Sequence, residues 1–205
     1  MASTKSFAEA VKDRRTYYAL SNESTIPDSR VQEIVKDAVL HTPSAFNSQT
    51  SRVVVLLGDE HVKTWDIIAE VYKQQLPEEK FNQANKRFVG FRAAYGTILF
   101  YEDTDNVREF QNKFKTYEDK FPGWSEQTSG MHQYHVWTAL ETEGLGVNLQ
   151  HYNPLIDVRL ETEYKVPSTW SLKAQMVFGK PTSGPAVENK EFKPVEDRMK
   201  VYGAK

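Results

Sequence analysis

The stretch from Pro27 to Leu57 constrains the fold most, because a helix pattern and a strand pattern follow each other closely there. Apolar residues recur at the spacing of an amphipathic helix, at Val31, Ile34, Val35, Ala38 and Val39. Asp28 or Ser29 is the expected N-cap. The run from 52 to 57 is continuously apolar after its arginine, which is typical of a central strand covered on both faces.

The remaining pattern predicts helices separated by few strands. Helices are expected at 6–15, 59–75, 105–117 and 155–164, with partial helix at 78–94, and strands at 96–101, 147–150 and 172–178. We expect a turn at 121–124, and a helix capped by Ser129 that ends at Glu143-Gly144. Helices precede the first strand and separate the others, so the fold class is α+β in layers.

Composition excludes several kinds of protein. The 205 residues suit one domain, 1–205, and the formal net charge of −2 gives no general attraction to nucleic acid or to an anionic membrane. The chain has no cysteine, so disulfides, thiolate catalysis and cysteine-ligated metals are excluded. Without a run of eighteen apolar residues or a secretory signal, we expect a soluble intracellular protein, in the cytoplasm and possibly the nucleus.

No side-chain constellation in the sequence is typical of a catalytic centre. No Gly-x-Ser-x-Gly motif surrounds a serine, and Gly144-Leu145-Gly146 lacks the third glycine of a dinucleotide-binding turn. His132 and His135 share a helix face, but no acid stands at the expected zinc-ligand position. We therefore predict no metal and no catalytic side chain.

Several groups suited to ligand binding remain. The loop from Pro43 to Thr50 is rich in small polar side chains, although an ordinary helix-to-strand turn would use similar residues. Arg14-Arg15 could grip a phosphate or simply end a solvated helix. Gly146 follows Gly144 closely, which indicates that the backbone approaches another segment there. This inventory fits a cofactor that carries the chemistry while the protein orients it.

Four motifs, taken in order along the chain, resemble the FMN-dependent nitroreductase family. They are Arg14-Arg15-Thr16, Pro43-Ser44-Ala45-Phe46-Asn47-Ser48-Gln49, Glu143-Gly144-Leu145-Gly146 and Phe178-Gly179-Lys180-Pro181. The form Arg14-Arg15-Thr16-Tyr17-Tyr18-Ala19-Leu20 is similar to the compact branch of fungi and some bacteria, which includes proteins linked to fatty-acid-dependent repression. Tyr18 departs from the Lys or Arg of many members.

The resemblance implies a three-layer α-β-α sandwich with a mostly antiparallel central sheet, working as an intertwined homodimer. The tail 181–205 would wrap the partner subunit, and the loop 44–49 could serve the partner's flavin. The residues implied to bind FMN are Arg14, Arg15, Thr16, Tyr18, Ser44, Asn47, Gln49, Glu143, Gly144, Leu145, Lys180 and Arg198. A further flavin contact falls near Lys86 or Arg87.

The activity implied is FMN-dependent NAD(P)H oxidoreduction. Hydride would pass from NADH or NADPH to flavin N5 and then to a nitroaromatic or quinone-like acceptor, in a ping-pong sequence. Phe91, Tyr95, Phe121 and Trp124 could line the acceptor cleft, or belong to the core or the dimer interface. The alternative is a flavin-binding regulator of lipid or stress signalling whose partner segment is 185–205.

Overall fold

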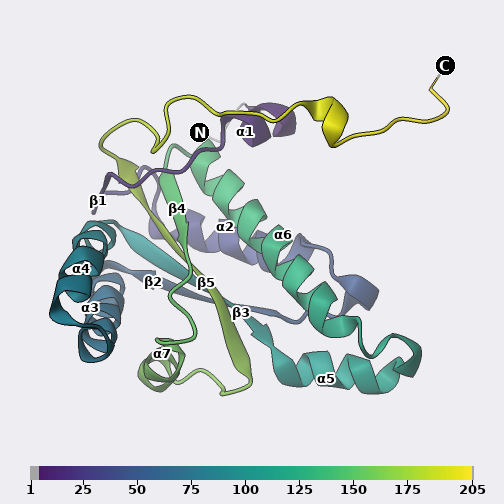
Figure 1. The fold of residues 1–205 in the computed structure, drawn as a ribbon, viewed down its shortest axis with the longest axis horizontal. Coiled ribbons are helices and arrows are strands. Elements are labelled where there is room, and N and C mark those ends of the chain that lie inside the picture. The colour runs from purple at the N-terminus through teal and green to yellow at the C-terminus, as the bar shows by residue number, and fades with distance from the viewer. Residues whose placement is uncertain (1–4, 205) are drawn as a thin grey trace.

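The structure, a computed structural model, describes residues 5–204 and shows an antiparallel sheet covered by helices on both faces (Figure 1). The strands are β1 (Leu20–Ser21), β2 (Ser51–Leu57), β3 (Gly96–Asp103), β4 (Gly146–Gln150) and β5 (Trp170–Pro181). The helices are α1 (Phe7–Asp13), α2 (Asp28–His41), α3 (Gly58–Gln75), α4 (Glu78–Arg92), α5 (Thr104–Lys113), α6 (Phe121–Thr142) and α7 (Asp157–Tyr164).

The two long strands β3 and β5 form the middle of the sheet. β3 pairs with β2 on one side, with Val54 opposite Leu99, and with β5 on the other, with Leu99 opposite Gln175. β5 also pairs with β4, where Leu149 lies opposite Met176, and its end pairs with β1. All these pairings are antiparallel, as the resemblance implied.

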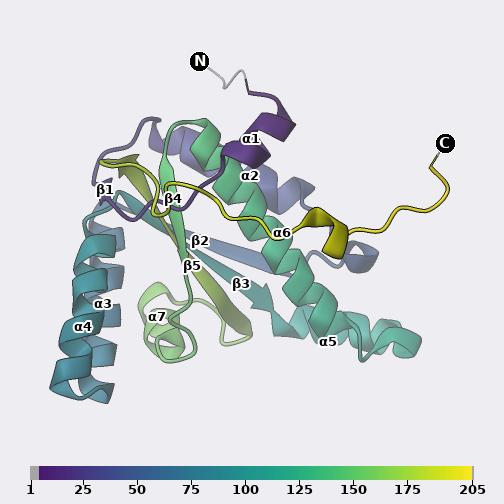
Figure 2. The same ribbon diagram turned by 45° about the horizontal axis from the view of Figure 1, so that its top comes forward.

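Alternate residues of the central strands supply two cores, one on each face. Ile98 and Phe100 point to the face covered by α2 and α6, where Val35 and Leu140 are buried with them. Leu99 and Tyr101 point to the opposite face, covered by α3, α4 and α7. Figure 2 shows the same division of helices between the two faces. The predicted three-layer α+β sandwich is therefore confirmed.

The prediction that 52–57 is covered on both faces is confirmed, because Val54 packs in one core and Val55 in the other, but the prediction that this strand is central is wrong. Within the described chain, β2 pairs with β3 only and lies at the end of the strand order. Most of its side chains are only partly buried, and Leu56 is the one that is buried. A continuous apolar run indicates packing on both faces of a strand but does not distinguish a central from an edge position.

Other element predictions also need correction. Residues 121–124 are the first turn of α6, because Pro122 is compatible with the start of a helix. Ser129 therefore lies inside α6, where it is buried, and does not cap it. α2 begins after Pro27, with no side chain capping it. α4 is a continuous helix, and β3 continues through Glu102 and Asp103.

After β5, the chain first follows its own N-terminal segment. Backbone hydrogen bonds join Thr182 to Ala19 at 2.9 Å and Ala186 to Thr16 at 2.7 Å. Beyond these contacts the tail continues past α1 and extends away from the sheet (Figure 1). Its large apolar side chains are exposed, namely Val187, Phe192, Val195, Met199, Val201 and Tyr202. Across residues 5–204, no helix has the length and apolar character needed to span a membrane.

Candidate binding site

The glycine turn after α6 brings the segment 14–18 against the sheet. Gly144 has a φ of 85° just after the helix, which is the left-handed conformation that glycine adopts at helix ends. A Cβ atom on Gly146 would lie 2.7 Å from Leu20 Cδ2 and 2.9 Å from Tyr17 Cβ. The close approach predicted from the second glycine is confirmed, and the approaching segment is the one that follows Arg14-Arg15.

Hydrogen bonds then hold this segment along β4. The backbone N–H of Tyr17 donates to the carbonyl of Val147 at 2.9 Å. The amide of Asn148, which is fully buried, donates to the carbonyl of Tyr17 at 2.8 Å. Tyr17 and Tyr18 consequently line different cavities, one on each side of the segment.

The first cavity, which we call the α4 pocket, has a volume of about 320 Å³. It is lined by Tyr18, Lys86, Arg87, Gly90, Phe91 and Gln150. Tyr18 is 53% exposed, and its ring centroid lies 6.3 Å from that of Phe91. A Cβ on Gly90 would meet no atom within 4 Å, so open space lies above this part of α4. The pocket therefore offers two cations, two rings and one amide to a ligand.

The second cavity, the α1 pocket, has a volume of about 600 Å³ and lies between α1, the end of α6 and the tail. Its cationic lining residues are Lys5, Lys12, Arg14, Arg15 and Lys190. The guanidinium of Arg14 lies over the Trp137 ring, 4.5 Å from its centroid. The Arg15 guanidinium donates to the backbone carbonyls of Val187 and Glu188.

Glu141 forms part of the α1 pocket wall and has a displaced pKa. Burial raises the pKa of its carboxyl to about 7, against the opposing effects of the Arg15 backbone N–H, the Trp137 indole and the nearby Arg14 and Lys190 charges. The carboxyl accepts hydrogen bonds from Arg15 N at 2.8 Å and from Trp137 Nε1 at 2.6 Å. It therefore ties α6 to the start of the segment 14–18.

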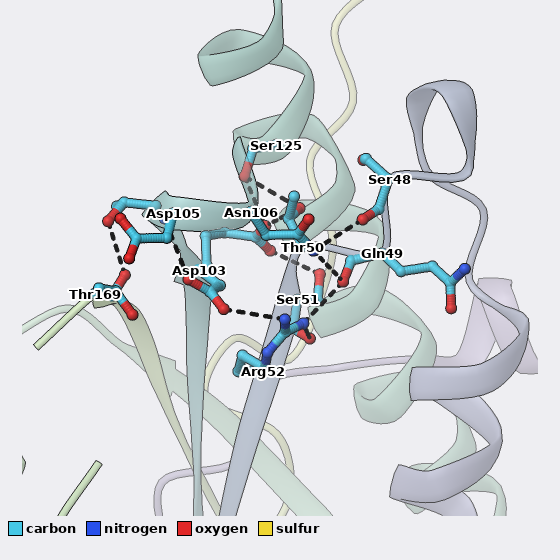
Figure 3. Close-up of polar contacts among 12 residues, drawn as sticks. Ser48, Gln49, Thr50, Ser51, Arg52, Asp103, Asp105, Asn106, Ser125 and Thr169 are labelled. Carbon is cyan, nitrogen blue, oxygen red and sulfur yellow. Dashed lines mark hydrogen bonds and ion pairs between the residues drawn. The ribbon is translucent and has the colours of Figure 1, made fainter. Parts of the chain in front are cut away.

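The polar loop before β2 is a compact turn with unusual backbone angles. Phe46, Asn47 and Gln49 have φ values of 55°, 54° and 50°, in the left-handed region that side chains rarely occupy. The Gln49 N–H donates to Ser44 Oγ at 3.0 Å, closing the loop on itself. Figure 3 shows the polar contacts at the end of this loop.

The structure places the implied flavin residues in several locations. Arg14, Arg15, Gly144 and Leu145 line the α1 pocket, and Tyr18 lines the α4 pocket. Ser44 and Gln49 line a small cavity of about 140 Å³ between α2, β2 and α6, and Asn47 is exposed beside them. The Thr16 carbonyl accepts the Ala186 N–H.

The side chains of the three remaining residues have polar partners elsewhere in the described chain. Glu143 forms an ion pair of 2.8 Å with Arg30, which directs its carboxylate toward α2. Lys180 pairs with Glu23 at 2.6 Å. Arg198 lies on the exposed tail, where it donates to the Lys193 carbonyl at 3.3 Å.

Sequence reasoning missed Gln150 and Gly90 as lining residues of the α4 pocket. Gln150 ends the strand that follows the glycine turn, and its amide donates to Asn148 Oδ1 at 2.9 Å. Its position at the end of the strand that Gly146 begins was the available signal. Gly90 carried no signal, because a glycine on an exposed helix face has no fixed meaning.

The two histidines of α6 contact neighbouring side chains within the protein. His132 is buried, with its ring edge-on to Phe100 at 5.7 Å between centroids, and burial lowers its pKa to about 4. His135 Nδ1 lies 3.2 Å from Thr42 Oγ1. Among the described residues, no cluster of three His, Asp or Glu side chains could hold a metal ion.

An antiparallel α+β sandwich whose pockets present cations, rings and amides has the groups with which proteins bind and orient a cofactor. The model of the nitroreductase family matches residues 11–180 of the chain. Yeast (Saccharomyces cerevisiae) nitroreductase FRM2 is 36% identical over 205 residues, which cover 98% of this chain and 100% of FRM2. The chain therefore belongs to the nitroreductase family, and it is a nitroreductase-type oxidoreductase.

Solved structures agree with this assignment. The nitroreductase CinD of Lactococcus lactis, in complex with chloramphenicol or with 4-nitrophenol, is 42% identical to this chain. In both comparisons the TM-score is 0.87, and the match covers 96% of this chain and 100% of CinD. A Desulfovibrio desulfuricans protein solved in complex with FMN is 17% identical, with a TM-score of 0.71 over 98% of this chain and 100% of its own, and shows the common fold.

Proposed function

We propose that this protein is an FMN-dependent NAD(P)H oxidoreductase that reduces nitroaromatic or quinone-like acceptors. The observation that carries the proposal is the α4 pocket, where two cations, two rings and an amide surround open space beside Gly90. Its volume of about 320 Å³ lies within the range of small-molecule sites. The family membership supplies the class of reaction, and the pocket supplies a place for the ligand.

The chemistry of the lining residues fits a flavin. Tyr18 and Phe91 offer ring faces or edges to a flat heterocycle, and the Gln150 amide can both donate to and accept from its polar edge. Lys86 and Arg87 can neutralise negative charge on a reduced ring. On the other side of the segment 14–18, Arg14 and Arg15 offer planar guanidinium groups for a phosphate.

FMN, when bound, supplies a ring that accepts hydride and passes it on, so no side chain needs to act as nucleophile or metal ligand. The chain's own residues then have three tasks: to bind the phosphate, to orient the ring, and to leave one ring face open for NAD(P)H and acceptor. The open space at Gly90 supports the last task. The CinD complexes with chloramphenicol and 4-nitrophenol support flat aromatic acceptors.

A homodimer is part of the proposal. The tail from 187 to 202 exposes six large apolar side chains, with Phe192 at 77% and Tyr202 at 90% exposure. β2 has a strand partner on only one side within the described chain. A second copy that received the tail would cover these apolar groups, and would bring the loop 44–49 of one subunit toward the pocket of the other. This arrangement uses the tail for assembly, and so removes the main support for the regulator alternative.

Titration of the flavin-free protein with FMN tests the site. Arg87→Ala and Lys86→Ala should each weaken FMN binding by about tenfold, the loss expected for one charge-assisted contact. Lys80→Ala is the matched control, because Lys80 is an exposed cation on the same helix that does not line the pocket. Equal affinities in all three variants and the wild type would reject the α4 pocket as the flavin site.

A further inference from the structure

A buried carboxylate lies beneath the polar loop and is not part of either pocket. Glu102, near the end of β3, is only 2% exposed. Three hydroxyl groups donate to it, Thr50 Oγ1 at 2.5 Å, Ser125 Oγ at 2.6 Å and Ser51 Oγ at 2.7 Å. The contacts therefore connect the end of the loop, β2, β3 and α6 at one point, near the labelled residues of Figure 3.

The three hydroxyl groups that donate to the Glu102 carboxyl are all uncharged. Burial raises the pKa of its carboxyl, while the three hydroxyls and the more distant charge of Lys173 oppose this effect. The neighbouring cation Arg52 forms its ion pair with Asp103 instead, at 3.0 Å. A buried carboxyl is costly unless its oxygens are hydrogen-bonded, so these hydroxyls are held firmly in place.

A second set of contacts fixes the backbone of the same loop. Asn106 Nδ2 donates to the carbonyls of Ser48 at 3.0 Å and Gln49 at 3.3 Å, and Arg52 Nη1 donates to Gln49 O at 2.8 Å. The Asp103 N–H donates to the Thr50 carbonyl at 2.9 Å. Figure 3 shows these donors gathered around the end of the loop. Three successive carbonyls are thus held from β2, β3 and α5.

The middle of the loop is anchored by rings. The Phe46 ring has its centroid 4.6 Å from that of Phe114, and it also packs on Tyr117, Phe121 and Trp124 at 5.6–5.9 Å. Left-handed backbone at non-glycine residues persists only where the surroundings determine it, and it concentrates at functional sites. With Phe46 anchored by rings and Thr50 by Glu102, the exposed side chains of Asn47 and Gln49 lie on the short span between the anchors.

We propose that Glu102 is a positioning residue that holds the loop 44–50 in the shape that presents Asn47 and Gln49 to the flavin in the partner subunit's pocket. The inference rests on the proposed function, because it assumes that this loop contacts FMN. Glu102 itself touches no ligand; it acts through Thr50 and Ser51. Without its carboxylate, the hydroxyls of Thr50, Ser51 and Ser125 lose their common acceptor and the loop relaxes from its strained conformation.

A double-mutant cycle measured by FMN titration of the flavin-free protein separates this role from general stabilisation. Asn47→Asp removes the amide donor yet tolerates the left-handed backbone, and should weaken FMN binding by about tenfold. Glu102→Ala should weaken it comparably, and Glu102→Gln, which retains one acceptor oxygen, should weaken it less. In the Glu102→Ala background, Asn47→Asp should have little further effect, because the residue is already misplaced.

The control is Thr64→Val, which removes the contacts of a buried hydroxyl with Tyr164 and with the Glu60 carbonyl, remote from the loop. It should lower thermal stability and leave FMN affinity unchanged. Additive effects of Glu102→Ala and Asn47→Asp, or an unchanged affinity in Glu102→Ala, would overturn the positioning role. If Glu102→Ala does not fold, the same cycle with Glu102→Gln decides. A wild-type protein that binds no FMN would instead refute the proposed function.

Discussion

The Trp137 indole nitrogen donates a 2.6 Å hydrogen bond to Glu141, one turn further along α6. The other carboxyl oxygen accepts the backbone N–H of Arg15 at 2.8 Å, and the Arg14 guanidinium covers the same indole ring. Arg14 and Arg15, which the sequence suggested as phosphate-binding residues, are thus positioned by Glu141. This partly buried acid on α6 is 126 residues from Arg15 in the chain.

Glu141 predicts a specific pH dependence of stability. Its pKa is raised from 4.5 to about 7, so the folded state holds a proton that the unfolded state has released. Its contribution to stability is therefore fully present below about pH 4.5 and is lost as the pH rises through 7. In Glu141→Gln, the urea concentration at the midpoint of unfolding should fall less between pH 4.5 and about pH 7 than it does in the wild type. Glu109→Gln, on an exposed site of α5, should keep the wild-type profile; an unchanged decline in Glu141→Gln contradicts the account.

Gly146→Ala should destabilise the protein by about 1–3 kcal/mol, the usual cost of overpacking. The added Cβ would meet Leu20 and Tyr17 below 3 Å, and would push the segment 14–18 away from β4. Gly130→Ala is the control, because Gly130 lies within α6 and a Cβ atom there would meet no atom within 4 Å. This substitution should stabilise the protein by about 0.5–1 kcal/mol. Urea unfolding measures both; equal stabilities of the two variants would show that the contact at Gly146 is easily relieved.

Lys165→Gly should stabilise the protein by about 1 kcal/mol, because Lys165 ends α7 in the left-handed conformation, with a φ of 51°. Lys165→Ala removes most of the same exposed side chain but keeps a Cβ atom on the left-handed backbone, so it should not raise the stability of the protein. Thermal unfolding of the two variants compares them directly. A gain in both would assign the effect to the lysine side chain rather than to its backbone.

Removal of residues 191–205 should leave a monomer with weakened flavin binding. This deletion retains the hydrogen bonds of 186–190 to the N-terminal segment, including that of Lys190 Nζ to the Lys12 carbonyl at 2.8 Å. It removes the exposed apolar groups Phe192, Val195, Met199, Val201 and Tyr202. Mass in solution and flavin content are the measurements. A stable dimer that retains FMN would reject the role of the tail in assembly.

Periodicity alone predicted the α+β class, α2, α3 and the two central strands, because buried faces repeat along each element. It misplaced 52–57, where an edge strand has the same apolar run as a central one. It also missed that 121–124 begin α6, since proline and glycine there resemble a turn while the first helical turn tolerates both.

Contacts between distant residues explain what the sequence could not predict about the site. In the sequence, Glu102 follows a predicted strand and shows no sign of burial. Its hydrogen-bond partners Ser51, Thr50 and Ser125 are 51, 52 and 23 residues away, and no local pattern connects them. The resemblance implied that Glu143 offers its backbone N–H to the flavin; its carboxylate pairs with Arg30, 113 residues away, which no local pattern could predict. Gly146, by contrast, was predictable, because two glycines so close exceed what a helix end requires.

We expect this chain to work as a flavin-dependent reductase. An absorption spectrum of the purified protein, followed by anaerobic addition of NADH or NADPH, tests it most directly. We expect the visible bands of a bound flavin, which bleach on addition of the nicotinamide and return when a nitroaromatic or quinone acceptor is added. A colourless protein that takes up no FMN, or a bound flavin that neither nucleotide reduces, would contradict it.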